Sequence, residues 1–371
     1  MTQNMESKPQ IKRETKNKIR VEFERTALKD RLKAKYGSSF FFKRVIWYIF
    51  RLLLLIGIAF VVLQPFYTMI VNSLMAPQDF VDPTVVKVPR HLSMGIYKAI
   101  ILDVQYFKFF FTTMGLSLVC ALLQTFTACL VGYGLAKFKF RGNKIVFFAV
   151  VLTLVIPHGT LQAAMYYRFS YFDILGILKF FSGGTRTGIA GLDSILSKIK
   201  ILPWPNGINL MNTITPLLLL SVCGLAFKNG LYIFMLRQFF RGVPDELEES
   251  AYLDGADSFR TFWQIILPLS VPMMITVFLF SFCWQWTDDF YTRLFFISAK
   301  TPSLMTYLSA GLPASFVSLI TSYTEISHSS PDYVQAMKYG CGMMICLPLI
   351  ILYLFCQKYL VQGIERSGIV G

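Results

Sequence analysis

The stretch PDELEESAYLDGADSFRTFWQIILPLSVP, residues 244–272, decides the fold of this chain. It is polar and rich in acidic residues, yet it lies between two apolar runs of membrane length. Across the 371 residues, 54% are apolar and only 15% are charged. Soluble domains carry about 25% charged residues, so the composition predicts an integral membrane protein. The polar stretch is then a segment that the protein presents to the aqueous phase.

Local signals in this stretch predict two short helices. Pro244 suits the first position of a helix, where its missing N–H costs nothing, and four acidic residues follow where the helix dipole favours anions. Gly255 is expected to end that helix, because glycine turns the chain without a steric penalty. Asp257 or Ser258 can cap the second helix, which leads into the next apolar run. We call this segment, residues 244–267, the coupling hairpin.

The coupling hairpin carries a spaced motif. The sequence Glu249-Ser250-Ala251 is followed by Gly255 and, after nine further residues, by Ile-x-Leu-Pro ending at Pro268. This spacing resembles the coupling motif of binding-protein-dependent ABC import permeases, written EAA, G, nine residues, I-x-L-P, with Ser250 in place of alanine. In that family the hairpin docks into a groove on the ATPase subunit. The residues that the resemblance implies for this contact are Glu249, Ser250, Ala251, Asp254, Gly255, Ile265, Leu267 and Pro268. An ordinary amphipathic loop is the alternative interpretation.

Apolar runs of about 20 residues predict the membrane spans. We expect an all-α membrane protein with the ABC importer permease fold. Six spans are predicted near 46–72, 112–136, 145–166, 211–236, 268–288 and 334–357, with the coupling hairpin between the fourth and the fifth. The permease domain is expected over 45–371, with an outer insertion over 167–210.

Charge in the short segments predicts orientation. The tail 1–44 holds thirteen Lys or Arg against five acidic residues, and the loop 137–144 holds four basic residues and no acidic one. Basic segments remain on the cytoplasmic side, so both termini and the coupling hairpin are expected in the cytoplasm. The tail itself is predicted either as a helix on the inner leaflet or as a solvated tail. The formal charge of +15 is placed beside spans, which favours lipid headgroups over nucleic acid.

The order of spans and the ending QKYLVQG, residues 357–363, look like the maltose-type carbohydrate branch of that family, as the second permease of the pair. The resemblance covers roughly 52–371. It implies a bacterial inner-membrane protein with an ABC ATPase dimer, a second homologous permease and an extracytoplasmic solute-binding protein as partners. It also implies that the outer segment 296–330 contacts the binding protein and that residues 368–371 contact the ATPases. No GxxxxGK[ST] occurs in the chain, so ATP and Mg are expected on the partner ATPase, with no cofactor and no metal on this subunit.

Polar residues in the predicted spans are candidates for the substrate pathway. These are Gln124, Asn212, Lys228, Gln285 and Asp288. Each could also hydrogen-bond backbone or join helices, and Lys228 could extend to cytoplasmic headgroups. His158 follows Pro157 at an expected kink. Trp284 and Trp286 suggest an interfacial belt.

The remaining features exclude other classes. All seven cysteines lie in apolar runs and are expected to be buried side chains without disulfides. The sequence holds no HExxH or GxSxG, so an enzyme is not expected. The function predicted is a permease subunit for an oligosaccharide or glycan fragment. Alternatives are an ABC permease for a glycerol phosphate ester or polyamine and a secondary transporter, for which broken helices and inverted repeats would be the signature.

Overall fold

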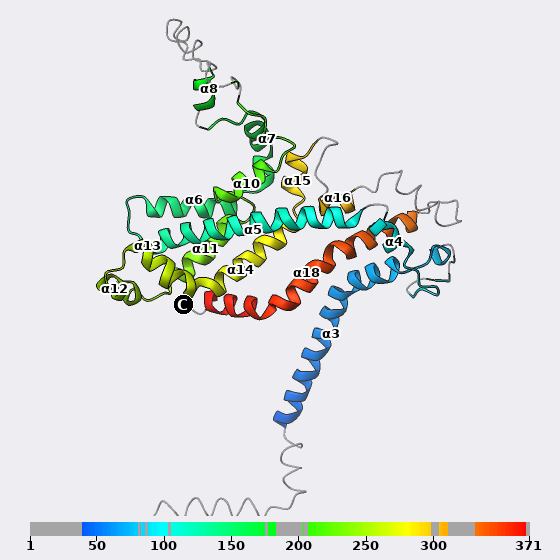
Figure 1. Cartoon of the computed structure of the whole chain (residues 1–371). Helices are drawn as coiled ribbons and strands as arrows, with labels where there is room; N and C mark the ends of the chain where they lie inside the picture. The colour runs from blue at the N-terminus through cyan, green and yellow to red at the C-terminus, as the bar shows by residue number, and fades with distance from the viewer. Residues whose placement is uncertain are drawn as a thin grey trace, which may run out of the picture. The chain divides into compact units, whose positions relative to one another are not determined.

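The computed structural model describes residues 39–80, 82, 84–85, 88–102, 105–174, 177–182, 203, 207–297, 304–310 and 331–368 (Figure 1). Most of the predicted basic tail, much of the insertion 167–210, most of the segment 296–330 and the last three residues lie outside these ranges. The chain divides into two compact units, Met1–Thr68 and Met69–Gly371. Within the described residues, all regular structure is helical apart from two isolated β-bridges, Met75 with Leu92 and Phe172 with Ile208.

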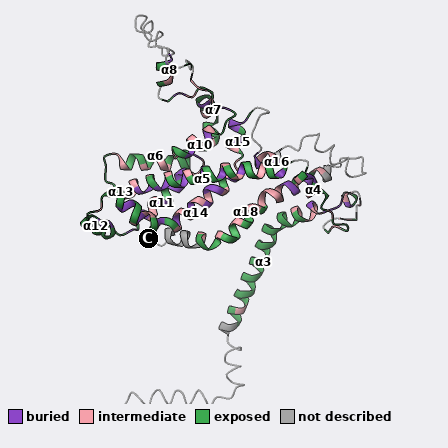
Figure 2. Cartoon of the chain, in the orientation of Figure 1, coloured by how far each residue is buried: buried purple, intermediate pink, exposed green. Residues whose placement is uncertain are grey.

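The first unit consists, in its described part, of most of helix α3 (Ser39–Ser73). At 1.5 Å per residue this 35-residue helix is about 50 Å long, enough to cross a bilayer. Its apolar side chains are exposed along its length, as the green ribbon in Figure 2 shows. A helix that is apolar on all faces is suited to a surrounding of lipid or of other membrane helices.

The core of the second unit is built around α5 (Tyr106–Lys137), which packs against α11 (Asn229–Arg241) and α14 (Leu267–Trp286). In turn, α14 contacts α18 (Pro331–Gly368), and α11 contacts α6 (Asn143–Val155). Buried residues, purple in Figure 2, occur along α5, α11 and α14. A Cβ at Gly132 would lie 3.0 Å from the Cβ of Leu236, so glycine allows the close approach of α5 and α11.

The remaining described helices lie between these elements or at their ends. They are η1 (Pro77–Phe80), α4 (Gly95–Leu102), η2 (His158–Leu161), α7 (Gln162–Ser170), α8 (Ile177–Phe181), α10 (Thr215–Val222), α12 (Glu246–Leu253), α13 (Ser258–Thr261), η3 (Phe262–Ile266), α15 (Phe290–Phe295) and α16 (Met305–Ala310).

The third predicted span bends sharply at Pro157. The helices Asn143–Val155 and His158–Ser170 meet at 100°. Ile156 is extended, with φ −70° and ψ 120°, because the residue before a proline avoids the helical region. Proline also lacks the N–H that would continue the helix. The kink expected beside His158 is therefore present, and it is a full break.

The fourth predicted span, near 211–236, is not one continuous helix. Helix α10 ends at Val222 and α11 begins at Asn229. Between them Gly224 has φ +71° and Lys228 has φ +65°, and two left-handed residues cannot continue a right-handed helix. The apolar composition of this run concealed the break, since composition reports burial and not backbone conformation. The chain thus has two helix breaks, the expected one at Pro157 and an unexpected one between α10 and α11.

Among the described residues, four helices are long and apolar enough to cross a membrane, or five if the bent pair around Pro157 is one span. They include Phe42–Ser73, Tyr106–Lys137, Ser258–Trp286 and Val334–Leu360. Neither α10 nor α11, of 8 and 13 residues, is long enough by itself. The count of six spans remains a prediction from the sequence.

Candidate coupling site

The coupling hairpin consists of two short helices joined at a left-handed glycine. Helix α12 ends in a Schellman motif, in which Gly255 N–H donates to the carbonyl of Tyr252 (3.1 Å) and Ala256 N–H donates to that of Ala251 (3.0 Å). Gly255 has φ +82°, and a Cβ there would meet no atom within 4 Å. The turn therefore requires glycine for its backbone conformation and not for lack of space.

The second helix of the coupling hairpin is capped and continuous with α14. The side chain of Asp257 accepts from Arg260 N–H at 2.8 Å, which selects Asp257 over Ser258 as the capping residue. After α13 the chain makes one wide π turn over Phe262–Ile266 and continues as α14. This turn precedes Pro268, whose missing N–H would leave an α-helical carbonyl without its donor. The coupling hairpin is thus joined without a loop to a membrane-length helix.

Lys137 fixes α12 to the end of α5. Its side chain is only 7% exposed, and its amine donates to the carbonyl of Val243 at 2.8 Å and to the carboxylate of Asp245 at 2.5 Å. The same amine lies 3.5 Å from the carboxylate of Glu248. The hydrogen bond from Lys137 lowers the pKa of Asp245, which keeps this carboxylate ionised. The charge-assisted contacts hold the coupling hairpin to the core.

The motif residues of the coupling hairpin divide into an outer and an inner set. Glu249, Ser250, Asp254, Gly255 and Pro268 are exposed, whereas Ala251 is 5% exposed and Ile265 and Leu267 are half-buried. Large apolar side chains accompany the exposed set, above all Leu253 (89% exposed) and Phe259 (69%). An exposed apolar surface rimmed by carboxylates is typical of a protein contact.

Three of the substrate-pathway candidates hold the fold together. Gln124 is 2% exposed, donates to Ser221 Oγ (3.2 Å) and accepts from Ser281 Oγ (2.7 Å), so it joins α5, α10 and α14. The carboxylate of Asp288 accepts from Tyr291 N–H and Thr292 N–H and supports the first turn of α15.

The third substrate-pathway candidate that holds the fold together is Asn212. Its Oδ1 accepts from Ile297 N–H at 2.9 Å and joins the chain before α10 to the end of α15. Gln285 is half-buried on the last turn of α14. Lys228 is the N-cap residue that precedes α11, and its amine lies over the ring of Trp284, 5.3 Å from the centroid. Since Trp284 lies at the end of α14 remote from the coupling hairpin, the Lys228 amine does not extend toward the hairpin side.

Two smaller expectations need correction. Trp286 is 1% exposed and its Nε1–H donates to the carbonyl of Ile345 at 3.1 Å, so it is a core residue and not part of an interfacial belt. Trp284 is 45% exposed, and its place in a belt stays a prediction. Cys223 is exposed at the break after α10, whereas Cys120, Cys129 and Cys341 are buried as expected. Cys223 is exposed because the helix ends there, so no following helical turn covers its side chain.

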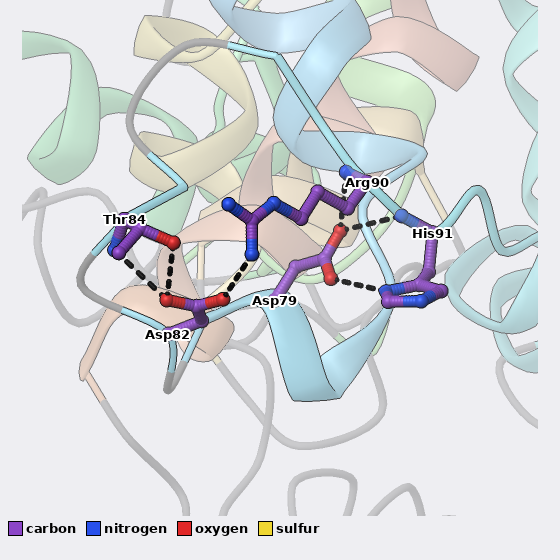
Figure 3. Close-up of polar contacts among 5 residues, drawn as sticks. All are labelled: Asp79, Asp82, Thr84, Arg90 and His91. Carbon is purple, nitrogen blue, oxygen red and sulfur yellow. Dashed lines mark hydrogen bonds and ion pairs between the residues drawn. The ribbon is translucent and has the colours of Figure 1, made fainter.

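Sequence reasoning missed a polar cluster in the segment that follows α3. Asp79, 3% exposed, accepts from the N–H groups of Arg90 and His91 at 2.8 Å each and from His91 Nδ1 at 2.7 Å (Figure 3). These contacts, led by the His91 N–H, lower the pKa of Asp79. Beside it Asp82 accepts from Thr84 and from Arg90 Nη1. No motif marks this cluster, because its partners are eleven and twelve residues apart in irregular chain.

The sequence and the fold have counterparts among known proteins. The chain is 23% identical over 313 residues to "Inner membrane ABC transporter permease protein YcjP" of Escherichia coli K12, covering 84% of this chain and 92% of that protein. It is 24% identical over 324 residues to "Polygalacturonan/rhamnogalacturonan transport system permease protein YtcP" of Bacillus subtilis 168, covering 85% and 96%.

The fold is shared with a chain from the "Crystal structure of a bacterial ABC transporter involved in the import of the acidic polysaccharide alginate", at a TM-score of 0.59 and 19% identity. That likeness covers 85% of this chain and 97% of the other. Residues 124–366 match the family described as "Binding-protein-dependent transport system inner membrane component", and this match includes the coupling hairpin. The chain is therefore a member of the family of inner-membrane components of binding-protein-dependent transport systems.

Proposed function

We propose that this chain is a permease subunit of an ATP-driven ABC importer that moves an oligosaccharide or glycan fragment into the cytoplasm by alternating access. The observation that carries the proposal is the coupling hairpin: two helices joined at Gly255, fixed to α5 by Lys137 and continuous with α14. Such a rigid element can transfer movement of a soluble subunit to a membrane helix.

The docking surface for that subunit is the exposed side of the coupling hairpin. We propose Glu249 and Gly255, both exposed, as its central residues, with Leu253 as its most exposed apolar side chain. An ABC ATPase dimer is the partner proposed, with ATP and Mg on the ATPase. A second homologous permease and an extracytoplasmic binding protein complete the proposed assembly. Membership of a binding-protein-dependent family supports the binding protein. In this arrangement both termini and the coupling hairpin are cytoplasmic, as the basic segments 1–44 and 137–144 favour.

The substrate class rests on the named relatives. They include transport-system permeases named for polygalacturonan/rhamnogalacturonan, for starch degradation products and for arabinooligosaccharides. A glycan fragment is therefore proposed ahead of a glycerol phosphate ester or a polyamine. Carboxylated glycans belong among the candidates, since two of the similar proteins are named for polysaccharides of that kind.

The test is affinity purification of the tagged chain from its native membrane, followed by mass spectrometry. We expect an ATPase, a sister permease and a binding protein to co-purify, and Leu253→Asp to reduce the ATPase yield about tenfold or more while the sister permease remains. The conservative variant Leu253→Met is the matched control. Recovery of a transport-competent chain without any ATPase would overturn the proposal.

Recovery of a transport-competent chain without an ATPase would favour a secondary transporter. The two broken helices at Pro157 and at Gly224–Lys228 are the one observation that agrees with this alternative, because such transporters place their sites at helix breaks. The same purification distinguishes the two functions, since only the importer requires an ATPase for uptake.

A further inference from the structure

The two helix breaks lie next to each other in the second unit. The ring of His158, one residue after Pro157, contacts the ring of Phe227 at a tilt of 56°, with 4.6 Å between centroids. Phe227 belongs to the break between α10 and α11. Tyr291 of α15 contacts both rings, with centroids 6.2 Å away in each case. Non-helical backbone inside a membrane protein is tolerated where it is buried or lines a polar path.

A positive charge lies at this junction. The amine of Lys228 is 4.9 Å from the ring centroid of Phe227 and 5.3 Å from that of Trp284. The 13 residues of α11 separate it from the coupling hairpin end by about 20 Å, so the charge lies deep along the core helices. An ionisable side chain at such depth is expensive, and by default it indicates a functional site. Trp284 is 45% exposed and Lys228 is half-buried, so both can be reached.

A second and independent feature is a set of buried polar atoms without a partner. Asn229 is 1% exposed, and neither Oδ1 nor Nδ2 has a hydrogen-bond partner among the described residues. Its amide faces the break, since a Cβ at Gly224 would lie 3.7 Å from Nδ2. The hydroxyl of Tyr291, 2% exposed, is also unpartnered in the described part of the chain. Buried polar groups are almost always hydrogen-bonded, so these atoms have hydrogen-bonding capacity that a ligand can use.

We propose that this junction is a substrate subsite for the carboxylate-bearing ring of an acidic saccharide. Lys228 binds the carboxylate, and the exposed face of Trp284 packs against the sugar C–H groups. The amide of Asn229 and the hydroxyl of Tyr291 bind sugar hydroxyls. This inference rests on the proposed function and narrows its substrate class to uronate-containing glycans.

The carboxylates nearby do not oppose an anion here. Asp288 already accepts from two N–H groups and from the hydroxyl of Thr292, which offset its charge. Asp289 forms an ion pair with Arg293 at 2.6 Å. Lys228, in contrast, makes only ring contacts among the interactions described, so its charge is available to a ligand.

The experiment measures binding to the purified full chain in nanodiscs by saturation-transfer NMR, with trigalacturonate as the acidic probe and maltotriose as the neutral probe of equal length. We expect trigalacturonate to bind at least about tenfold more tightly than maltotriose, and Lys228→Met to abolish that preference. Lys228→Arg keeps the charge and is expected to retain it. Lys98→Met, which removes an exposed lysine on α4, is the matched control.

Equal binding of both probes to the native chain, or undiminished trigalacturonate preference in Lys228→Met, would overturn the subsite. If Lys228→Met is not monodisperse, the preference of the wild-type chain for trigalacturonate over maltotriose is measured from 0.05 to 0.5 M NaCl. A preference that depends on charge must weaken as the salt concentration rises. A preference that stays unchanged refutes the role of Lys228. Because no ATPase is present in this assay, its result is separate from the purification test. An importer that couples to its ATPase but ignores trigalacturonate would retain the proposed function and lose this inference.

Discussion

The amine of Lys137 lies 3.5 Å from the carboxylate of Glu248, and this contact joins the last residue of α5 to the first helix of the coupling hairpin. Glu248 is 8% exposed, whereas the neighbouring motif residue Glu249 is exposed. Two adjacent glutamates on one helix, about 100° apart, thus have different surroundings. One anchors the coupling hairpin to the core, and the other is presented to solvent.

Removing the charge of Lys137 is expected to loosen the coupling hairpin. Lys137→Met leaves the Glu248 carboxylate buried without a counter-charge, which costs about 3 kcal/mol because a buried ion loses its partner. A lower unfolding temperature of the purified chain and weaker ATPase co-purification are the expected results. Lys139→Met, which alters an exposed lysine two residues away, is expected to change neither. The double variant Lys137→Met/Glu248→Leu should recover part of the stability that Lys137→Met loses. A double variant less stable than Lys137→Met would mean that the Lys137–Glu248 contact is not the cause.

Substitution of Gly255 should act through the backbone. Because φ is +82° and the space for a Cβ is open, Gly255→Ala is expected to cost about 1 kcal/mol and Gly255→Asn less, since asparagine adopts the left-handed region more readily. Gly255→Asp adds a charge to the exposed surface and should reduce ATPase co-purification furthest. The measurement is ATPase yield with membrane insertion as control. Equal yields for all three variants would remove this turn from the coupling contact.

The Asp79 cluster should make the segment after α3 sensitive to acid. The pKa of Asp79 is below its ordinary value of 3.8, so its contribution to stability is complete above about pH 4 and is lost as the pH falls through the lower folded value. Hydrogen exchange of the Arg90 and His91 amides is expected to speed up below pH 4, after correction for intrinsic rates. Asp79→Asn should show fast exchange already at pH 7. Protection that persists in Asp79→Asn would mean that other groups hold these amides.

Gln124 is expected to affect stability and not selectivity. Gln124→Leu deletes the hydrogen bonds to Ser221 and Ser281 and is expected to destabilise the chain by about 1–2 kcal/mol. The relative uptake of acidic and neutral trisaccharides should stay as in the native importer. A change in that ratio would return Gln124 to the substrate pathway.

Both helix breaks illustrate the limits of reading spans from composition. The break at Pro157 can be predicted from the sequence, because proline cannot continue a helix and restricts the residue before it. The break at Lys228 cannot be predicted in this way, since lysine has no preference for the left-handed conformation. That conformation follows from how α10 and α11 pack against α5. The same holds for Gln124, whose partners are 97 and 157 residues away.

The sequence by itself determined the all-helical membrane class, the helical hairpin with its turn at Gly255 and a cap at Asp257 or Ser258, because these depend on apolar length, backbone freedom and hydrogen bonds within a few residues. Only the tertiary structure decided that Lys137 anchors α12, that Trp286 is buried and that His158 meets Phe227. Those contacts join segments far apart in the chain. Many helix surfaces are equally apolar, and only packing decides which of them face each other.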